Sequence, residues 1–237
     1  MNNMSFLPKL LFLIRRPQLI VVGGNKSAAA AEAIFRVLRS HFGQGNVSKS
    51  QKINSADLWR SKFLVLEVDS QKAEALSKYL RSAENSVLAV VWAEHDYSSL
   101  AKLVACLPAN GFLVLNFDDE AARELRMKTR SRVLTFGLER PDQSLIKADF
   151  QASDIRINPV RKGEDLTGQG AEFSNGINGS SANFKIIYKG SIVPVWLNDF
   201  SDREQIYLAL SAVAVGTALG INLVELSQAL GAQSVVE

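Results

Sequence analysis

The fold of this chain is decided by residues 107–138, LPANGFLVLNFDDEAARELRMKTRSRVLTFGL. Within this stretch, Phe112–Asn116 is an apolar run of the length expected for a buried parallel strand. A helix is expected directly after it, with Asp118 or Asp119 able to cap the first turn. Residues 132–136 then return as a second strand. The stretch therefore predicts a β–α–β unit of a parallel sheet, in which ligands bind beyond the carboxyl ends of the strands.

The rest of the chain extends the same alternating pattern. Strands are expected at 18–22, 63–68, 86–92 and 149–157, and residues 184–197 are expected to form antiparallel strands with a hairpin turn at Lys189-Gly190-Ser191. Helices are expected at 28–40, 202–219 and 223–230, and at 71–82, where Ala73, Leu76 and Leu80 lie on one apolar stripe. Polar segments at 43–54 and 161–182 are expected to be loops. The sequence thus predicts an α/β domain over residues 18–237, with a mainly parallel, doubly wound sheet, a small antiparallel β part at 149–197 and two C-terminal helices.

Composition and charge exclude several classes of protein. The 237 residues are 47% hydrophobic and 22% charged, as is ordinary for a soluble globular protein. The net charge of +3 comes from dispersed basic residues and forms no basic stripe, so nucleic-acid binding is not indicated. A single cysteine, Cys106, rules out a disulfide framework. We therefore expect a cytoplasmic protein.

The N-terminal segment is a separate feature. Residues 6–14 are apolar apart from Pro8 and Lys9, but a membrane-spanning helix needs about 20 such residues. The segment also lacks the basic start and the cleavage site of a signal peptide. We expect residues 1–17 to form a helical extension packed on the domain, with peripheral membrane contact as the alternative and no transmembrane segment.

A glycine turn between the first strand and the first helix resembles a phosphate cradle in position. It consists of Gly23, Gly24, Asn25, Lys26 and Ser27. Backbone amides and a helix N-terminus would face an anion there. A Walker A motif, however, has four residues between its first Gly and its Gly-Lys-Ser/Thr. Only Gly24 and Asn25 separate Gly23 from Lys26, so the loop is shortened.

The sequence pattern of residues 107–138 resembles that of the ATP-binding central domain of the Mur ligases of peptidoglycan synthesis. The pattern is LP-x-x-G-x-x-V-L-N-x-D-D followed by V-x-T-F-G-L. The closest resemblance is to the member that adds D-alanyl-D-alanine. Residues 31–43, AEAIFRVLRSHFG, and 205–226, QIYLALSAVAVGTALGINLVEL, are also similar to this family. The likeness extends from about residue 19 to residue 230, and it implies the same α/β fold.

The resemblance implies roles for particular residues. Asn116 and Asp118 match an Asn and an Asp that lie at the nucleotide; the alternative is that they only end a strand and cap a helix. Glu67 matches a carboxylate that binds Mg²⁺, with a solvated glutamate as the alternative. His95 matches a histidine that helps to hold a second metal ion, although a structural role is the alternative.

The phosphate loop can be placed on the family pattern in two ways. Without a gap, Lys26 falls on the last loop glycine and Ser27 on the lysine. With one residue deleted, Lys26 and Ser27 match the family's lysine and threonine. In both placements the loop is altered, which predicts weak ATP binding.

Other parts of the family pattern have no counterpart in this sequence. The helix that carries a metal-supporting lysine is shortened, and Lys102 does not align with that lysine. The family's Gly-x-His-Asn is replaced by residues 201–204, SDRE, and the two flanking ligase domains have no match. We expect a degenerate Mur-ligase-like nucleotide-binding domain that does not catalyse ligation alone. The alternative is an active ATP-dependent amide ligase of cell-wall synthesis, completed by a partner protein.

Overall fold

The computed structural model describes residues 17–51, 55–68, 76–77, 80, 86–93, 97–139, 147–158 and 180–232. Along the chain these form β1 (Gln18–Gly23), α2 (Ser27–Phe42), β2 (Val47–Ser50), α3 (Ser55–Arg60), β3 (Phe63–Val68), β4 (Val87–Val90), α5 (Tyr97–Ala105), β5 (Phe112–Asn116), α6 (Glu120–Leu125), the 3₁₀ turn η1 (Arg126–Lys128), β6 (Arg132–Leu138), β7 (Phe150–Asn158), β8 (Ser180–Tyr188), β9 (Ser191–Phe200), α7 (Glu204–Ala218) and α8 (Leu223–Gly231). The strands of this described part join in one sheet, in the order β2-β3-β1-β4-β5-β6-β7-β8-β9.

The centre of the sheet is parallel and buried on both faces. β5 pairs with β4 on one side and β6 on the other, so the predicted strand Phe112–Asn116 lies inside the sheet, as the sequence indicated. Alternate residues of β1 point into two different cores: Ile20 and Val22 into one, Leu19 and Val21 into the other. Burying an aliphatic side chain of this kind contributes about 1.5–3 kcal/mol, which is why these strands are apolar throughout.

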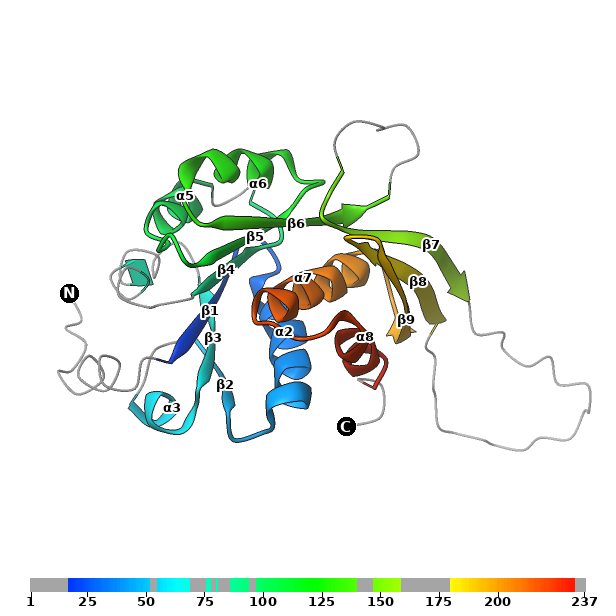
Figure 1. Ribbon diagram of the computed structural model, residues 1–237, viewed down its shortest axis with the longest axis horizontal. Helices are drawn as coiled ribbons and strands as arrows, with labels where there is room; N and C mark the ends of the chain where they lie inside the picture. Colours follow the sequence, from blue (N-terminus) through cyan, green and yellow to red (C-terminus); the bar gives the residue numbers. More distant parts are fainter. Residues whose placement is uncertain are drawn as a thin grey trace, which may run out of the picture.

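Helices cover both faces of the sheet (Figure 1). One core packs α2, α7 and α8 against the sheet, and the other packs α5 and α6. Leu76 and Leu80, from the helix predicted at 71–82, are buried in the second core, as the apolar stripe predicted. The doubly wound α/β fold predicted from the sequence is confirmed.

Two details of the prediction need correction. The antiparallel strands do not form a separate sheet: β7 pairs in parallel with β6, and β8 and β9 then continue the same sheet in antiparallel pairs. The segment 43–54, expected to be a loop, contains β2, a short edge strand that pairs only with β3. Its sequence, VSKS, is mostly polar because only Val47 points into the core.

The hairpin between β8 and β9 turns where the sequence predicted, with Lys189 and Gly190 at φ 48° and 82°. The expected N-terminal helical extension falls outside the described residues, as do His95 and most of the expected loop at 161–182. Across the described part of the chain, no helix is long and apolar enough to cross a membrane.

Candidate functional site

The loop between β1 and α2 lies where a phosphate cradle would lie. β1 ends at Gly23, and Gly24 turns the chain with φ 98°. Lys26 is the N-cap of α2 in a left-handed conformation, with φ 63° and ψ 20°, and its side chain makes no capping hydrogen bond. The carbonyl of Lys26 accepts the first helical hydrogen bond, from the Ala30 amide. The loop therefore presents Lys26 and Ser27 at the carboxyl end of β1.

Part of the loop backbone is already bound by the protein. The Asn25 amide donates to the Trp92 carbonyl at 2.8 Å, and the Ser27 amide donates to the Gly24 carbonyl at 3.2 Å. A Cβ atom on Gly24 would come within 2.0 Å of the Trp92 carbonyl oxygen, so the loop packs tightly against the chain after β4. A phosphate cradle works by directing backbone amides at the anion. Two amides here point at protein carbonyls instead.

Ser27 and Glu67 meet beside the loop. Parallel pairing of β1 with β3 sets Glu67 opposite Val22, and the Ser27 hydroxyl donates to Glu67 Oε1 at 3.3 Å. A hydroxyl and a carboxylate at adjacent strand ends suit Mg²⁺, which binds one or two carboxylates and completes its shell with water and substrate phosphates. No cluster of three or more His, Cys, Asp or Glu side chains was found in the described ranges. This pair fits an ion only together with a phosphate.

Lys26 forms an ion pair that the sequence did not predict. Its Nζ lies 2.9 Å from Oε2 of Glu204, the first residue of α7. The hydrogen bond and the charge of Glu204 raise the pKa of Lys26. Both side chains are about half exposed, at 51% and 46%. Lys26 thus already has an anionic partner from within the chain.

Asn116 and Asp118 lie at the end of β5, but neither caps the following helix. Asn116 is buried, and its Oδ1 accepts the Asp118 amide at 3.0 Å. Asp118 Oδ2 accepts the Leu138 amide at 2.8 Å and the Tyr207 hydroxyl at 2.9 Å. Asp119 is the N-cap of α6. Of the two capping residues that the sequence allowed, Asp119 is therefore the correct one, and Asp118 ties β6 and α7 to the end of β5.

The first turn of α7 joins the two halves of the site. Glu204 reaches Lys26, and Tyr207, one turn further along, reaches Asp118. The ring of Tyr207 also meets the ring of Trp92 edge-on, with centroids 5.6 Å apart. These contacts bring the loop and the end of β5 to one rim of the sheet. Trp92, Glu204 and Tyr207 were missed from the sequence; the only signal was the acidic replacement of the family motif at 201–204.

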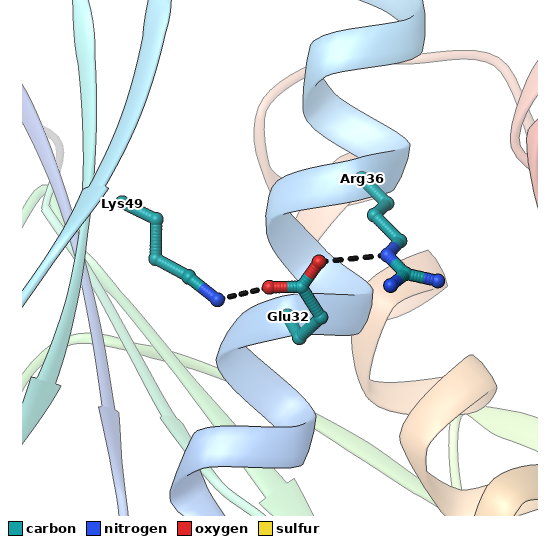
Figure 2. Close-up of polar contacts among 3 residues, drawn as sticks. All are labelled: Glu32, Arg36 and Lys49. Carbon is teal, nitrogen blue, oxygen red and sulfur yellow. Dashed lines mark hydrogen bonds and ion pairs between the residues drawn. The ribbon is translucent and has the colours of Figure 1, made fainter. Parts of the chain in front are cut away.

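A second polar group lies further along α2, away from the loop end of the helix. Figure 2 shows Glu32 between Arg36 of the same helix and Lys49 of β2. Burial raises the pKa of Glu32, but the hydrogen bonds from Lys49 and Arg36 outweigh it and hold the pKa below its ordinary value. Glu32 and Arg36 also border a hollow of about 350 Å³ between α2, α7, α8 and β9. This group fixes the edge strand to the helix.

Comparison with solved structures identifies the fold. The D-alanyl-D-alanyl-adding ligase of Acinetobacter baumannii, UDP-N-acetylmuramoylalanyl-D-glutamyl-2,6-diaminopimelate–D-alanyl-D-alanyl ligase, is matched over 95% of this chain with a TM-score of 0.69 and 15% identity. The MurF ligase of Thermotoga maritima in complex with ADP is matched over 100% of this chain with a TM-score of 0.63 and 15% identity. The chain has the fold of a Mur ligase central domain. A curated sequence supports the relation.

That sequence is the UDP-N-acetylmuramate–L-alanine ligase of Hydrogenobaculum sp. (strain Y04AAS1). This chain is 25% identical to it over 180 residues, which are 71% of this chain and 33% of the ligase. The domain covers 48% of the Acinetobacter ligase and 56% of the Thermotoga ligase. It thus spans about a third to a half of the length of these relatives. A comparison with models of protein families found no match.

Proposed function

We propose that this Mur ligase-like domain binds an adenine nucleotide at the carboxyl ends of β1, β3 and β5, and that it does not catalyse amide ligation alone. The observation that carries the proposal is the convergence of Lys26, Ser27, Glu67 and Asp118 on one rim of a parallel sheet. A nucleotide on the related Thermotoga ligase, which was solved with ADP, supports it. The buried, single Cys106 suits a reducing compartment, so we also propose a cytoplasmic location.

The adenosine end of the nucleotide is assigned to the end of β5. Asn116 accepts the Asp118 amide through Oδ1, and we assign its carboxamide N–H groups as the donors to the ligand. Asp118 holds the strand end in place through Leu138 and Tyr207. Recognition by Asn116 does not depend on the length of the phosphate chain. Adenosine and ADP should therefore bind about as well as ATP.

We assign the phosphate end of the nucleotide to the loop between β1 and α2, and we expect this end to contribute less to the affinity than the adenosine end. Two loop amides bind protein carbonyls, and Lys26 pairs with Glu204. Ser27 and Glu67 would hold Mg²⁺ beside a phosphate, and the ion would there neutralise phosphate charge. With so few groups directed at the phosphates, we expect ATP to bind weakly and Mg²⁺ to add little.

Ligation demands more than binding. Amide ligation through an acyl phosphate needs the phosphates, the metal ions and the amine to be aligned together. Removing one well-placed electrostatic contact from a site costs roughly 3–4 kcal/mol of transition-state stabilisation, and the shortened loop removes more than one. The retained Ser27–Glu67 contact favours a second candidate, an ATP-dependent ligase that a partner chain completes.

The test uses equilibrium dialysis of adenosine and ADP against the wild type and Asn116→Asp. This change keeps the oxygen that accepts the Asp118 amide but removes the amide donors. We expect wild type to bind both ligands similarly and Asn116→Asp to lose at least about tenfold in affinity for both, equal to about 1.4 kcal/mol. Ala109→Asp adds the same charge in an exposed turn before β5 and should bind normally. A wild type that binds neither ligand would refute the proposal.

A further inference from the structure

The Lys26–Glu204 pair lies between two helix ends. Lys26 is the N-cap of α2 and makes no side-chain capping bond there. Glu204 is the first residue of α7, where the Gln205 amide donates to Asp202 Oδ1 at 3.3 Å. Helix N-termini attract anions, and a lysine between two of them adds a full positive charge. Glu204 supplies an anion at this point, with its Oε2 2.9 Å from Lys26 Nζ.

Glu204 is held in position by the rest of its helix turn. Three residues along α7, Tyr207 donates its hydroxyl to Asp118 at 2.9 Å and packs its ring against Trp92. The Trp92 carbonyl in turn accepts the Asn25 amide from the loop. A closed ring of contacts therefore runs from the loop through Trp92, Tyr207 and Glu204 back to Lys26. The carboxylate is fixed where an anion bound to the lysine would lie.

We propose that Glu204 is a specificity-determining residue, a built-in anion that competes with the terminal phosphate of a nucleotide for Lys26. The inference rests on the nucleotide site proposed above. A phosphate that approached Lys26 would meet the carboxylate at the same ammonium, and like charges that share a site repel each other. The loss of affinity from this repulsion grows with the charge and the length of the phosphate chain. The repulsion therefore offsets the affinity that Lys26 would otherwise add through the phosphates, most for ATP, less for ADP and not at all for adenosine.

The substitution Glu204→Gln tests this without threatening the fold. Both partners are about half exposed, and exposed ion pairs contribute little to stability. Glutamine keeps the size and hydrogen-bonding capacity of the side chain but removes the charge. A matched control is Glu225→Gln on α8, which removes the same charge from a residue that pairs with His41 and not with Lys26.

The affinities of ATP, ADP and adenosine are measured by titration calorimetry without Mg²⁺. We expect Glu204→Gln to bind ATP about five- to tenfold more tightly than wild type, to gain less for ADP and to leave adenosine unchanged. Glu225→Gln should match wild type for all three ligands. Equal ATP affinity in Glu204→Gln and wild type would overturn the inference.

The outcomes separate this inference from the proposed function. If wild type binds adenosine but Glu204→Gln gains nothing for ATP, the role of Glu204 is wrong and the nucleotide site stands. If Glu204→Gln binds ATP more tightly than wild type while neither protein binds adenosine, the competition is correct and the adenosine assignment fails. If neither protein binds any of the three ligands, both claims fail.

Discussion

Gly24 is the residue on which the conformation of the loop between β1 and α2 depends most directly. Its φ of 98° strains any L-residue, and a Cβ atom would meet the Trp92 carbonyl oxygen at 2.0 Å. That oxygen belongs to the backbone and cannot turn away. We therefore predict that Gly24→Ala lowers the free energy of unfolding by at least about 1–3 kcal/mol, as measured by urea denaturation.

Gly45 provides the matched control for this change. It lies in the turn before β2, and a Cβ atom there would have nothing within 4 Å. Gly45→Ala should leave the stability close to that of wild type. Equal stability of the two variants would mean that the loop does not pack on Trp92 as described.

At the residue scale, the sequence predicted the positions in the site that follow a motif, and it missed those set by tertiary packing. Ser27 follows a strand and a glycine turn, and Glu67 lies near the end of the neighbouring strand, so their contact could be expected. Tyr207 reaches Asp118 across 89 residues of sequence. Glu204 reaches Lys26 across 178 residues, twice that interval. No local pattern encodes such contacts, because they depend on how α7 docks.

At the element scale, Glu32 links α2 to the edge strand β2. Its pKa lies below the ordinary 4.5 because the bonds from Lys49 and Arg36 outweigh its burial. A lowered folded-state pKa means that Glu32 stabilises the protein above its ordinary pKa, and that this contribution is lost as the pH falls through the folded-state value. Glu32→Gln should therefore be less stable than wild type at neutral pH by up to about 1 kcal/mol.

The prediction is checked by urea denaturation across a pH series. The difference between wild type and Glu32→Gln should shrink as the pH falls below 4.5. Glu124→Gln, at an exposed position on α6, should show no such trend. A difference for Glu32→Gln that stays constant with pH would contradict the assigned ion pair.

The elements that the sequence predicted well are those with long apolar runs. β1, β3, β4 and β5 are buried on both faces, so each reads as a continuous apolar segment. β2 was not predicted, because this four-residue edge strand buries only Val47 and so has no apolar run. The alternation of polar and apolar residues in 149–197 indicated antiparallel strands. It does not show whether these strands form a sheet of their own or join the main sheet. The parallel pairing of β6 with β7 joins them to the main sheet.

At the scale of the whole molecule, one continuous sheet carries both the loop and α7. β7, β8 and β9 extend the sheet beyond β6, and α7 and α8 pack on the face that they share with α2 (Figure 1). α7 is thereby held with its first turn over the carboxyl ends of β1 and β5. The antiparallel extension thus positions Glu204 and Tyr207 at the candidate site, and this arrangement could not be predicted from the local sequence.

The central claim is that the domain binds the adenosine part of a nucleotide, with little help from the phosphates and without turnover. Titration calorimetry with ATP, ADP and adenosine, with and without Mg²⁺, tests it most directly when combined with a phosphate-release assay. We predict that the affinity for ATP exceeds that for ADP or adenosine by no more than about threefold. Mg²⁺ should change these affinities little, and no phosphate should be released. Micromolar, Mg²⁺-dependent ATP binding with a clear preference over ADP, or phosphate release that Lys26→Ala abolishes, would contradict the claim.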